Sequence, residues 1–184
     1  VRMLVMPTNE NDEFPRFLAT GIYEKVSPSR ACLSNAMNVG HPSNLARFFD
    51  LYGGTVDRNG MVHRDPDRDE IRRRIHSVSV TDGETKRTIK RVYETYGVLL
   101  EPHGAVGWRG LEDYLDKSRY GGLCVSLETA HPAKFPAEIT ELLGIEPELP
   151  PSMRELDARI GEPVLLPADN DLFRTYLWER LQRS

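Results

Sequence analysis

Residues 78–127 read VSVTDGETKRTIKRVYETYGVLLEPHGAVGWRGLEDYLDKSRYGGLCVSL, and this stretch decides the fold that the sequence predicts. Within it, short apolar segments alternate with longer segments of helical spacing. A T-x-x-E capping box at Thr81 and Glu84 begins the first helix, and Gly97 ends it. The apolar segments are predicted to be strands, at 78–80, 98–100 and 123–127. Because strands that alternate with helices pair in parallel, the sequence predicts an α/β fold with a mostly parallel sheet flanked by helices.

The segments before this stretch extend the same arrangement. Residues 1–6 are apolar and predict a further buried strand. Phe14, Phe17 and Leu18 share one face of a short predicted helix that ends at Gly21. An arginine-rich stretch at 65–76 has two interpretations.

This arginine-rich stretch is either a phosphate-binding patch or an ordinary helix. A helix would have Asp65 as its cap and Pro66 at its first position. We favour the helix, because acidic residues come early and basic residues late, as the helix dipole prefers.

The end of the chain is expected to be less regular. Residues 143–168 are rich in proline and lack a clear period, which predicts an irregular surface segment. Residues 169–183 are predicted to form a closing helix with Asp169 as its cap. A chain of 184 residues suits a single domain, so we expect residues 1–184 to form one.

The composition of the chain argues against several functional classes of protein. The chain has 24 Lys and Arg against 28 Asp and Glu, a net charge of -4 that argues against a general nucleic-acid binder. No apolar run reaches the roughly 18 residues of a membrane span, so no membrane partner is expected. Cys32 and Cys124 are far apart in apolar surroundings, which is typical of reduced cysteines in a cytoplasmic protein. The five histidines lack the paired spacing of a zinc site, and no metal site is predicted.

Two candidate sites follow predicted strands. Glu101 and Gly104 lie in a turn of small residues at the start of a helix, where backbone N–H groups are free to meet a ligand. A tight turn with a capping role explains this turn equally well. Thr129 lies at the end of the next strand, and it faces the same crevice as Glu101 if the two strands are neighbours.

A third candidate is the polar segment 33–38, LSNAMN. Its polar side chains, those of Ser34, Asn35 and Asn38, could fold over a bound ligand. In the same region, Ser43 or Asn44 is expected to cap the helix that follows.

The order of four motifs resembles the C-terminal part of threonine synthases. The motifs are TNENDEFPRFL at 8–18, CLSNAMNVGHPSN at 32–44, LLEPHGAVG at 99–107 and SLETAHPAKF at 126–135. The resemblance implies part of the large domain of a fold-type-II enzyme that uses pyridoxal 5'-phosphate. Such an enzyme converts O-phospho-L-homoserine and water to L-threonine and phosphate.

The resemblance also implies roles for single residues. Thr129 would face the pyridine nitrogen of the cofactor, and Glu101 would lie near the same edge of the ring. Ser34, Asn35 and Asn38 would lie on the substrate side, although the family often has aspartate where Asn38 stands. Lys134 does not match the lysine that binds the cofactor covalently.

The family's Ser-Phe-Lys segment, which carries that lysine, is not found in the 184 residues, and neither is its glycine-rich G-N-F-G-N loop. We therefore predict that the chain is the C-terminal portion of a longer enzyme and needs the N-terminal portion of the same enzyme as its partner. The chain contributes no catalytic residue, and alone it is expected to be inactive. Two alternatives stay open: another fold-type-II lyase such as threonine dehydratase, and a non-catalytic module that binds a ligand or partner.

Overall fold

A short parallel ladder lies near the start of the chain. In the computed structural model, which describes residues 1–154, 156, 161 and 163–182, β1 (Leu4–Val5) pairs in parallel with β4 (Ile75–His76). The pairing continues beyond both strands, since Thr8 N–H donates to Val78 O at 3.0 Å and Val80 N–H donates to Thr8 O at 2.9 Å. The predicted strands at 1–6 and 78–80 therefore lie side by side.

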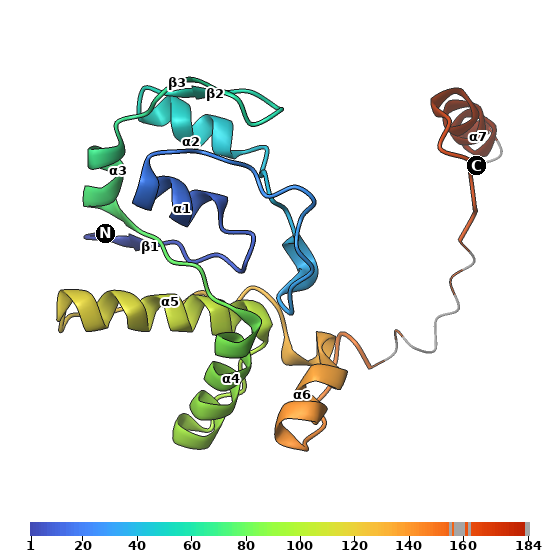
Figure 1. The fold of residues 1–184 in the computed structure, drawn as a ribbon. Helices are drawn as coiled ribbons and strands as arrows, with labels where there is room; N and C mark the ends of the chain where they lie inside the picture. The colour runs from blue at the N-terminus through green and yellow to red at the C-terminus, as the bar shows by residue number, and fades with distance from the viewer. Residues whose placement is uncertain (155, 157–160, 162, 183–184) are drawn as a thin grey trace. The chain divides into compact units, whose positions relative to one another are not determined.

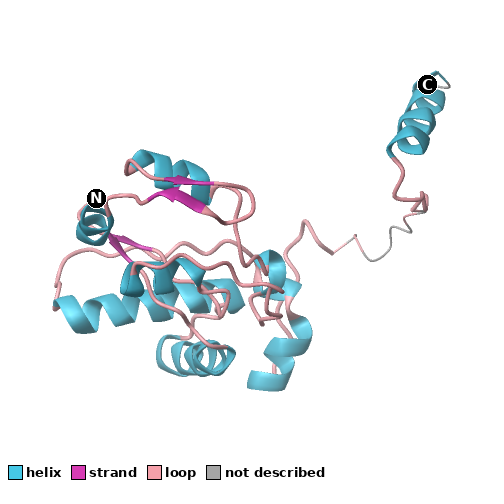
Figure 2. Ribbon diagram, turned by 45° about the horizontal axis from the view of Figure 1, so that its top comes forward, coloured by secondary structure: helices cyan, strands magenta, loops and turns pink. Residues whose placement is uncertain are grey.

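The remaining elements are mostly helical, and the structure is a mixed α/β fold with small sheets (Figures 1 and 2). In chain order they are α1 (Glu13–Thr20), η1 (Asn35–Met37), α2 (Leu45–Leu51), β2 (Thr55–Val56), β3 (Val62–Arg64), α3 (Arg68–Arg74), α4 (Asp82–Tyr96), α5 (Pro102–Ser118), η2 (Pro132–Lys134), α6 (Pro136–Leu143) and α7 (Asn170–Gln182). The antiparallel pair β2–β3 was not predicted from the sequence.

The predicted mostly parallel sheet is smaller than expected, because β1 and β4 are the only strands that pair in parallel among the described residues. Residues 98–100 and 123–127 follow helices as expected, but neither segment forms a ladder with any described residue. Leu123, Val125 and Leu127 are 90%, 72% and 76% exposed. A strand is stabilised by hydrogen bonds to its neighbours, and apolar sequence alone does not supply a neighbour.

Two apolar clusters hold the helices together. One joins α1, α2 and α3 around Phe17, Phe49 and Ile71, whose side chains are at most 2% exposed. The other joins α4, α5 and α6 around Ile89 and Ile139, which are fully buried. Figure 1 shows α4 and α6 on one side of the long helix α5, and α1 and α2 on the other.

Several helix boundaries follow the local signals in the sequence. Gly21 ends α1 in the left-handed region with φ of 83°, and Thr81 and Glu84 form the complete capping box of α4. The cap of α3 is Asp67, whose side chain accepts from Glu70 N–H, so the prediction of Asp65 is wrong. Arginine side chains of α3 pair with Glu70 on the same helix, as the helical interpretation expects.

The structure divides into two compact units, Val1–Glu148 and Leu149–Ser184. The described residues of 144–169 form no helix or strand, and α7 follows with Asp169 at its start, where Asp169 Oδ1 accepts from Asp171 N–H and Leu172 N–H. That the 184 residues form a single domain of a longer enzyme stays a prediction.

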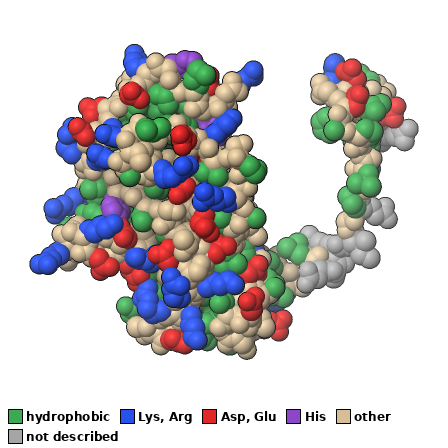
Figure 3. Space-filling model, viewed as in Figure 1, with side chains coloured by type: hydrophobic (Ala, Val, Ile, Leu, Met, Phe, Trp, Pro, Cys, Tyr) green, Lys and Arg blue, Asp and Glu red, His purple; other side chains and the backbone are tan. Residues whose placement is uncertain are grey.

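The visible face of the first unit carries interleaved acidic and basic side chains rather than a patch of one sign (Figure 3). That the protein is not a general nucleic-acid binder stays a prediction. Within the described part of the chain, no helix is long and apolar enough to cross a membrane.

Candidate functional site

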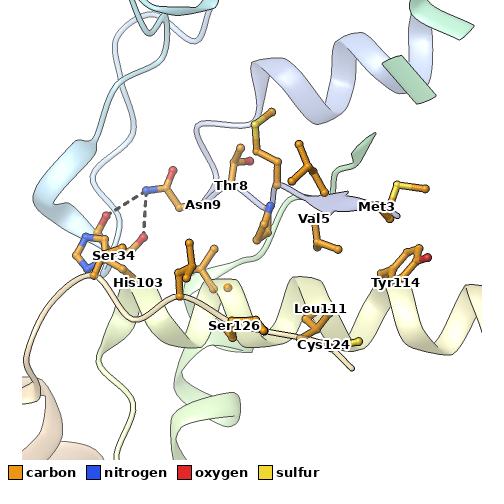
Figure 4. Close-up of a pocket in the computed structure, with 18 of the residues that line it drawn as sticks. Met3, Val5, Thr8, Asn9, Ser34, His103, Leu111, Tyr114, Cys124 and Ser126 are labelled. Atoms are coloured by element: carbon orange, nitrogen blue, oxygen red, sulfur yellow. Dashed lines mark hydrogen bonds between the residues drawn. The ribbon is translucent and has the colours of Figure 1, made fainter. Parts of the chain in front are cut away.

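A cavity of about 840 Å³ lies in the first unit, between the segment 1–9, α5 and residues 120–129 (Figure 4). One end is apolar and includes Met3, Leu111 and Tyr114, as Figure 4 shows. The other end is polar and holds side chains from separate parts of the chain, namely Thr8, Asn9, Ser34 and His103. Thr129 also lines the cavity. An apolar cavity with a few convergent polar groups is the usual form of a small-molecule site.

Asn9 joins two of the residues that the sequence singled out. Its Nδ2 donates to Ser34 Oγ at 3.1 Å, to Ser34 O at 3.2 Å and to Asn38 Oδ1 at 3.3 Å. Ser34 is buried and lines the cavity, whereas Asn35 is exposed in η1 and is not part of the cavity wall. The predicted substrate-side loop is therefore held by a residue 25 positions earlier, and Ser34 is its member that reaches the cavity.

Glu101 is fully buried at the start of α5. Its Oε1 accepts from Gly104 N–H at 2.8 Å, and its Oε2 accepts from His103 N–H at 2.8 Å. Oε2 also lies 2.6 Å from His103 Nδ1. Glu101 thus has the capping role that the sequence left open, and it does not itself line the cavity.

Gly104 is a point of close approach between α5 and the segment before Thr129. A Cβ atom at Gly104 would lie 1.7 Å from Glu128 Oε2, so the glycine makes room for this carboxyl group. Burial, and secondarily the charge of Glu101, raises the pKa of Glu128. The predicted neighbourhood of the two turns is therefore present, with Glu128 as the contacting residue.

Thr129 is exposed and contributes to the cavity wall. The residues after it form a turn in which His131 Nδ1 accepts from Ala133 N–H at 3.2 Å, so His131 has a structural partner in the backbone. Thr129 and His103 line one cavity, but whether Thr129 faces a cofactor ring stays a prediction.

Sequence reasoning missed two anchors of the loop 30–38. Asn11, only 3% exposed, accepts from Arg30 N–H at 2.8 Å through Oδ1 and donates to Arg30 O at 3.0 Å through Nδ2. Asp82, at the start of α4, accepts from Leu33 N–H at 2.8 Å. The signal that the sequence offers for Asn11 is the polar run at 9–12.

Three side-chain oxygens on the cavity wall are buried and lack a hydrogen-bond partner among the described residues: Thr8 Oγ1, Glu13 Oε2 and Ser126 Oγ. Burial raises the pKa of Glu13, which is 3% exposed. Because buried polar atoms without partners are costly, these three are the groups most ready to bond to a ligand or to another segment of chain.

The cavity wall fits pyridoxal phosphate in part. The hydroxyl of Thr129 is a suitable partner for a pyridine nitrogen, and the wall is mainly apolar. None of the described residues that line the cavity is a lysine, so the described part of this wall offers no lysine to bind the cofactor covalently.

Glu10, Cys32 and Asp82 bring one ligand atom each to within 4.8 Å of one another. Burial raises the pKa of the Cys32 thiol, and the nearby carboxylates act in the same direction. These three groups are the candidate ligands among the described residues, and no metal role is assigned to them.

The family model "Threonine synthase, C-terminal" matches residues 104–176. The chain is 36% identical over 180 residues to threonine synthase of Haemophilus influenzae, covering 96% of this chain and 37% of that protein. It is 34% identical over 172 residues to the Escherichia coli enzyme, covering 92% of this chain and 35% of the relative. The chain thus spans little more than a third of the length of these relatives.

Solved structures give the same result. The yeast threonine synthase matches with a TM-score of 0.82 and 26% identity, over 100% of this chain and 43% of the yeast chain. The PLP-bound threonine synthase of Brucella melitensis matches with a TM-score of 0.79 and 28% identity, over 97% of this chain and 40% of that chain. The chain is therefore a homologue of threonine synthases that corresponds to only part of their length.

Proposed function

We propose that this chain forms part of a threonine synthase, which converts O-phospho-L-homoserine and water to L-threonine and phosphate with pyridoxal 5'-phosphate as cofactor. The observation that carries the proposal is the convergence of the motif residues. Ser34, His103 and Thr129 come from three motifs of the resemblance and line one cavity.

Within this function, the chain's own residues would bind and orient. The hydroxyl of Thr129 would hydrogen-bond the ring nitrogen of the cofactor without forcing a proton onto it. Glu101 would lie near the same ring edge, and Gly104 would allow close approach of the backbone. When bound, pyridoxal phosphate supplies the electron sink for carbanion chemistry.

Ser34, Asn35 and Asn38 are proposed for the substrate side of the site. Ser34 is supported by its place in the cavity wall, and Asn38 by its bond to Asn9. We further propose a cytoplasmic enzyme, because both cysteines are free thiols.

The chain alone is proposed to be inactive, with the rest of the enzyme as its partner. The absence of lysine from the described cavity wall supports this, as does the coverage of 35–37% of the relatives' length. Mixing the 184-residue chain with pyridoxal phosphate and O-phospho-L-homoserine should release no phosphate. Sustained release of phosphate would show that the chain is complete as a catalyst.

A second experiment tests the reaction itself. The chain, together with the remaining part of the enzyme, is assayed on O-phospho-L-homoserine and on L-threonine. Phosphate release with the first substrate supports threonine synthase, whereas ammonia and 2-oxobutanoate from the second indicate a dehydratase. Turnover of neither substrate, with a folded protein, favours a non-catalytic binding module.

Thr129 allows a matched pair of variants in this assay. Thr129→Val keeps the shape of the side chain and removes the hydroxyl, whereas Thr129→Ser keeps the hydroxyl. We expect Thr129→Val to lose about tenfold or more in cofactor affinity or rate, and Thr129→Ser to stay within a few fold of the original. Equal effects of the two substitutions would contradict the proposed role of the hydroxyl.

A further inference from the structure

His103 connects separate segments of the chain at the polar end of the cavity. It lies in the first turn of α5, and its side chain is 19% exposed. Its ring meets three of the four sequence motifs: its own motif through Glu101, the loop 33–38 through Ala36, and the turn after Thr129 through Phe135. Figure 4 shows His103 beside Ser34 at the polar end of the cavity.

The hydrogen bonds of the ring define its tautomer. Ala36 N–H donates to His103 Nε2 at 3.2 Å, so Nε2 must carry a lone pair and no proton. In the neutral ring the proton is then on Nδ1, which lies 2.6 Å from Glu101 Oε2 and donates to it. Both ring nitrogens are thereby used, one as donor and one as acceptor.

Each partner of the ring is itself held in place. Glu101 is fully buried and fixed by the backbone N–H groups of His103 and Gly104. The ring of Phe135, which is 6% exposed, has its centroid 5.5 Å from that of His103. The imidazole therefore has a fixed orientation, and it presents its acceptor to the loop at Ala36.

We propose that His103 is a positioning residue, which in its Nδ1–H tautomer fixes the loop 34–38 relative to Glu101. This inference rests on the proposed function in one respect only. That function assigns the loop to the substrate side of the site and Glu101 to the cofactor side. The link itself is a property of the folded chain. A histidine at this position fixes the loop relative to Glu101, because Nε2 accepts from Ala36 N–H and Nδ1–H donates to Glu101.

Two substitutions separate the two nitrogens. Glutamine places its amide oxygen near the position of Nε2 and can still accept from Ala36 N–H. Asparagine places its amide near the position of Nδ1, can still donate to Glu101, and leaves Ala36 N–H without an acceptor. His103→Gln and His103→Asn are thus a matched pair of similar polarity.

The measurement is the hydrogen-exchange rate of the Ala36 amide in the 184-residue chain, which requires neither cofactor nor turnover. We expect exchange in His103→Asn to be about tenfold faster than in the original chain, and exchange in His103→Gln to lie within about threefold of it. The amides of Phe49 and Ile71, in the other apolar cluster, should keep their protection and report on the fold.

The matched pair gives a readout that a simple packing role would not move. Both substitutions remove the imidazole ring and its contact with the ring of Phe135, so a packing role would affect the two variants alike. Protection of the Ala36 amide in His103→Gln and its loss in His103→Asn would therefore report the acceptor at the position of Nε2.

The outcomes are distinct. Faster exchange in His103→Asn than in His103→Gln supports the proposal. Equal exchange of Ala36 in the two variants overturns it. If the asparagine variant does not fold, His103→Leu, which offers no acceptor to Ala36 N–H, takes its place in the comparison. Failure of the phosphate-release assay would leave this result unaffected, so the two proposals are separable.

Discussion

Replacement of Glu101 by glutamine tests whether its buried carboxylate stabilises the turn at the start of α5. The carboxylate accepts from three N–H groups, two at Oε2 and one at Oε1, and it is fully buried. Glutamine has one oxygen and one NH₂ group. Whichever way the amide is turned, at least one backbone N–H at the start of α5 then faces another donor.

The size of the effect follows from these contacts. A buried donor that loses its acceptor costs about 1–3 kcal/mol, and loss of an N-terminal cap costs about 1 kcal/mol. We therefore expect Glu101→Gln to lower the free energy of unfolding by about 2–4 kcal/mol.

Glu84→Gln is the matched control. It makes the same chemical change at the start of a neighbouring helix, but Glu84 is 31% exposed and glutamine also serves in a capping box. Its cost should stay below about 0.5 kcal/mol. Both values are measured by urea denaturation followed by circular dichroism at 222 nm. Equal free energies of unfolding for the two variants would refute the argument that the buried carboxylate organises this turn.

Two further predictions use other buried groups. Burial raises the pKa of Glu13 above its ordinary 4.5, so the folded state binds this proton more tightly than the unfolded state. The stability that this group contributes is present below about pH 4.5 and is lost as pH rises through the raised pKa. Glu13→Gln should remove this slope and leave the chain more stable at pH 7, as shown by urea midpoints from pH 4 to pH 8; an unchanged slope would contradict the assignment. Gly40→Ala and Gly104→Ala should differ, because the new Cβ would lie 1.9 Å from the backbone oxygen of Val26 in the first and 1.7 Å from the side-chain carboxyl oxygen of Glu128 in the second, and a side chain can rotate away where a backbone oxygen cannot. The first should cost about 1–3 kcal/mol and the second less than about 1 kcal/mol with a shifted Glu128 titration, and the reverse order would show that Glu128 cannot move.

Local signals predicted the helices well. Gly21 acts on residues close to it in sequence, as does the capping box of Thr81 and Glu84, so the sequence contains the whole interaction. The segments 98–100 and 123–127 show that local signals do not predict strand pairing. Their apolar sequences favour strands, but pairing needs a neighbour, and no described residue provides one.

The same reason limits what the sequence says about the candidate site. Ser34, Glu101 and Thr129 could be singled out because their motifs are contiguous in sequence, and their roles stay predictions. His103 was passed over as part of a turn, since its partner Ala36 lies 67 positions away. The separation between Asn9 and Ser34 is 25 positions, and a single sequence gives no sign of such a contact. Residues that bond to distant backbone look like ordinary polar residues until the fold is known.

The distant contacts named above all hold the loop 30–38 in place. Apart from the short turn η1, this loop has no regular structure, and Asn35 N–H, which donates to Leu33 O at 2.9 Å, is an exception among backbone groups that otherwise need partners outside the loop. Side chains from outside the loop satisfy them instead: Asn11 at Arg30, Asp82 at Leu33, Asn9 at Ser34 and His103 at Ala36. A loop anchored at four points from three segments is part of the scaffold rather than a lid. A ligand in the cavity would therefore meet Ser34 in a preformed position, and the free energy of binding would not include the cost of ordering the loop.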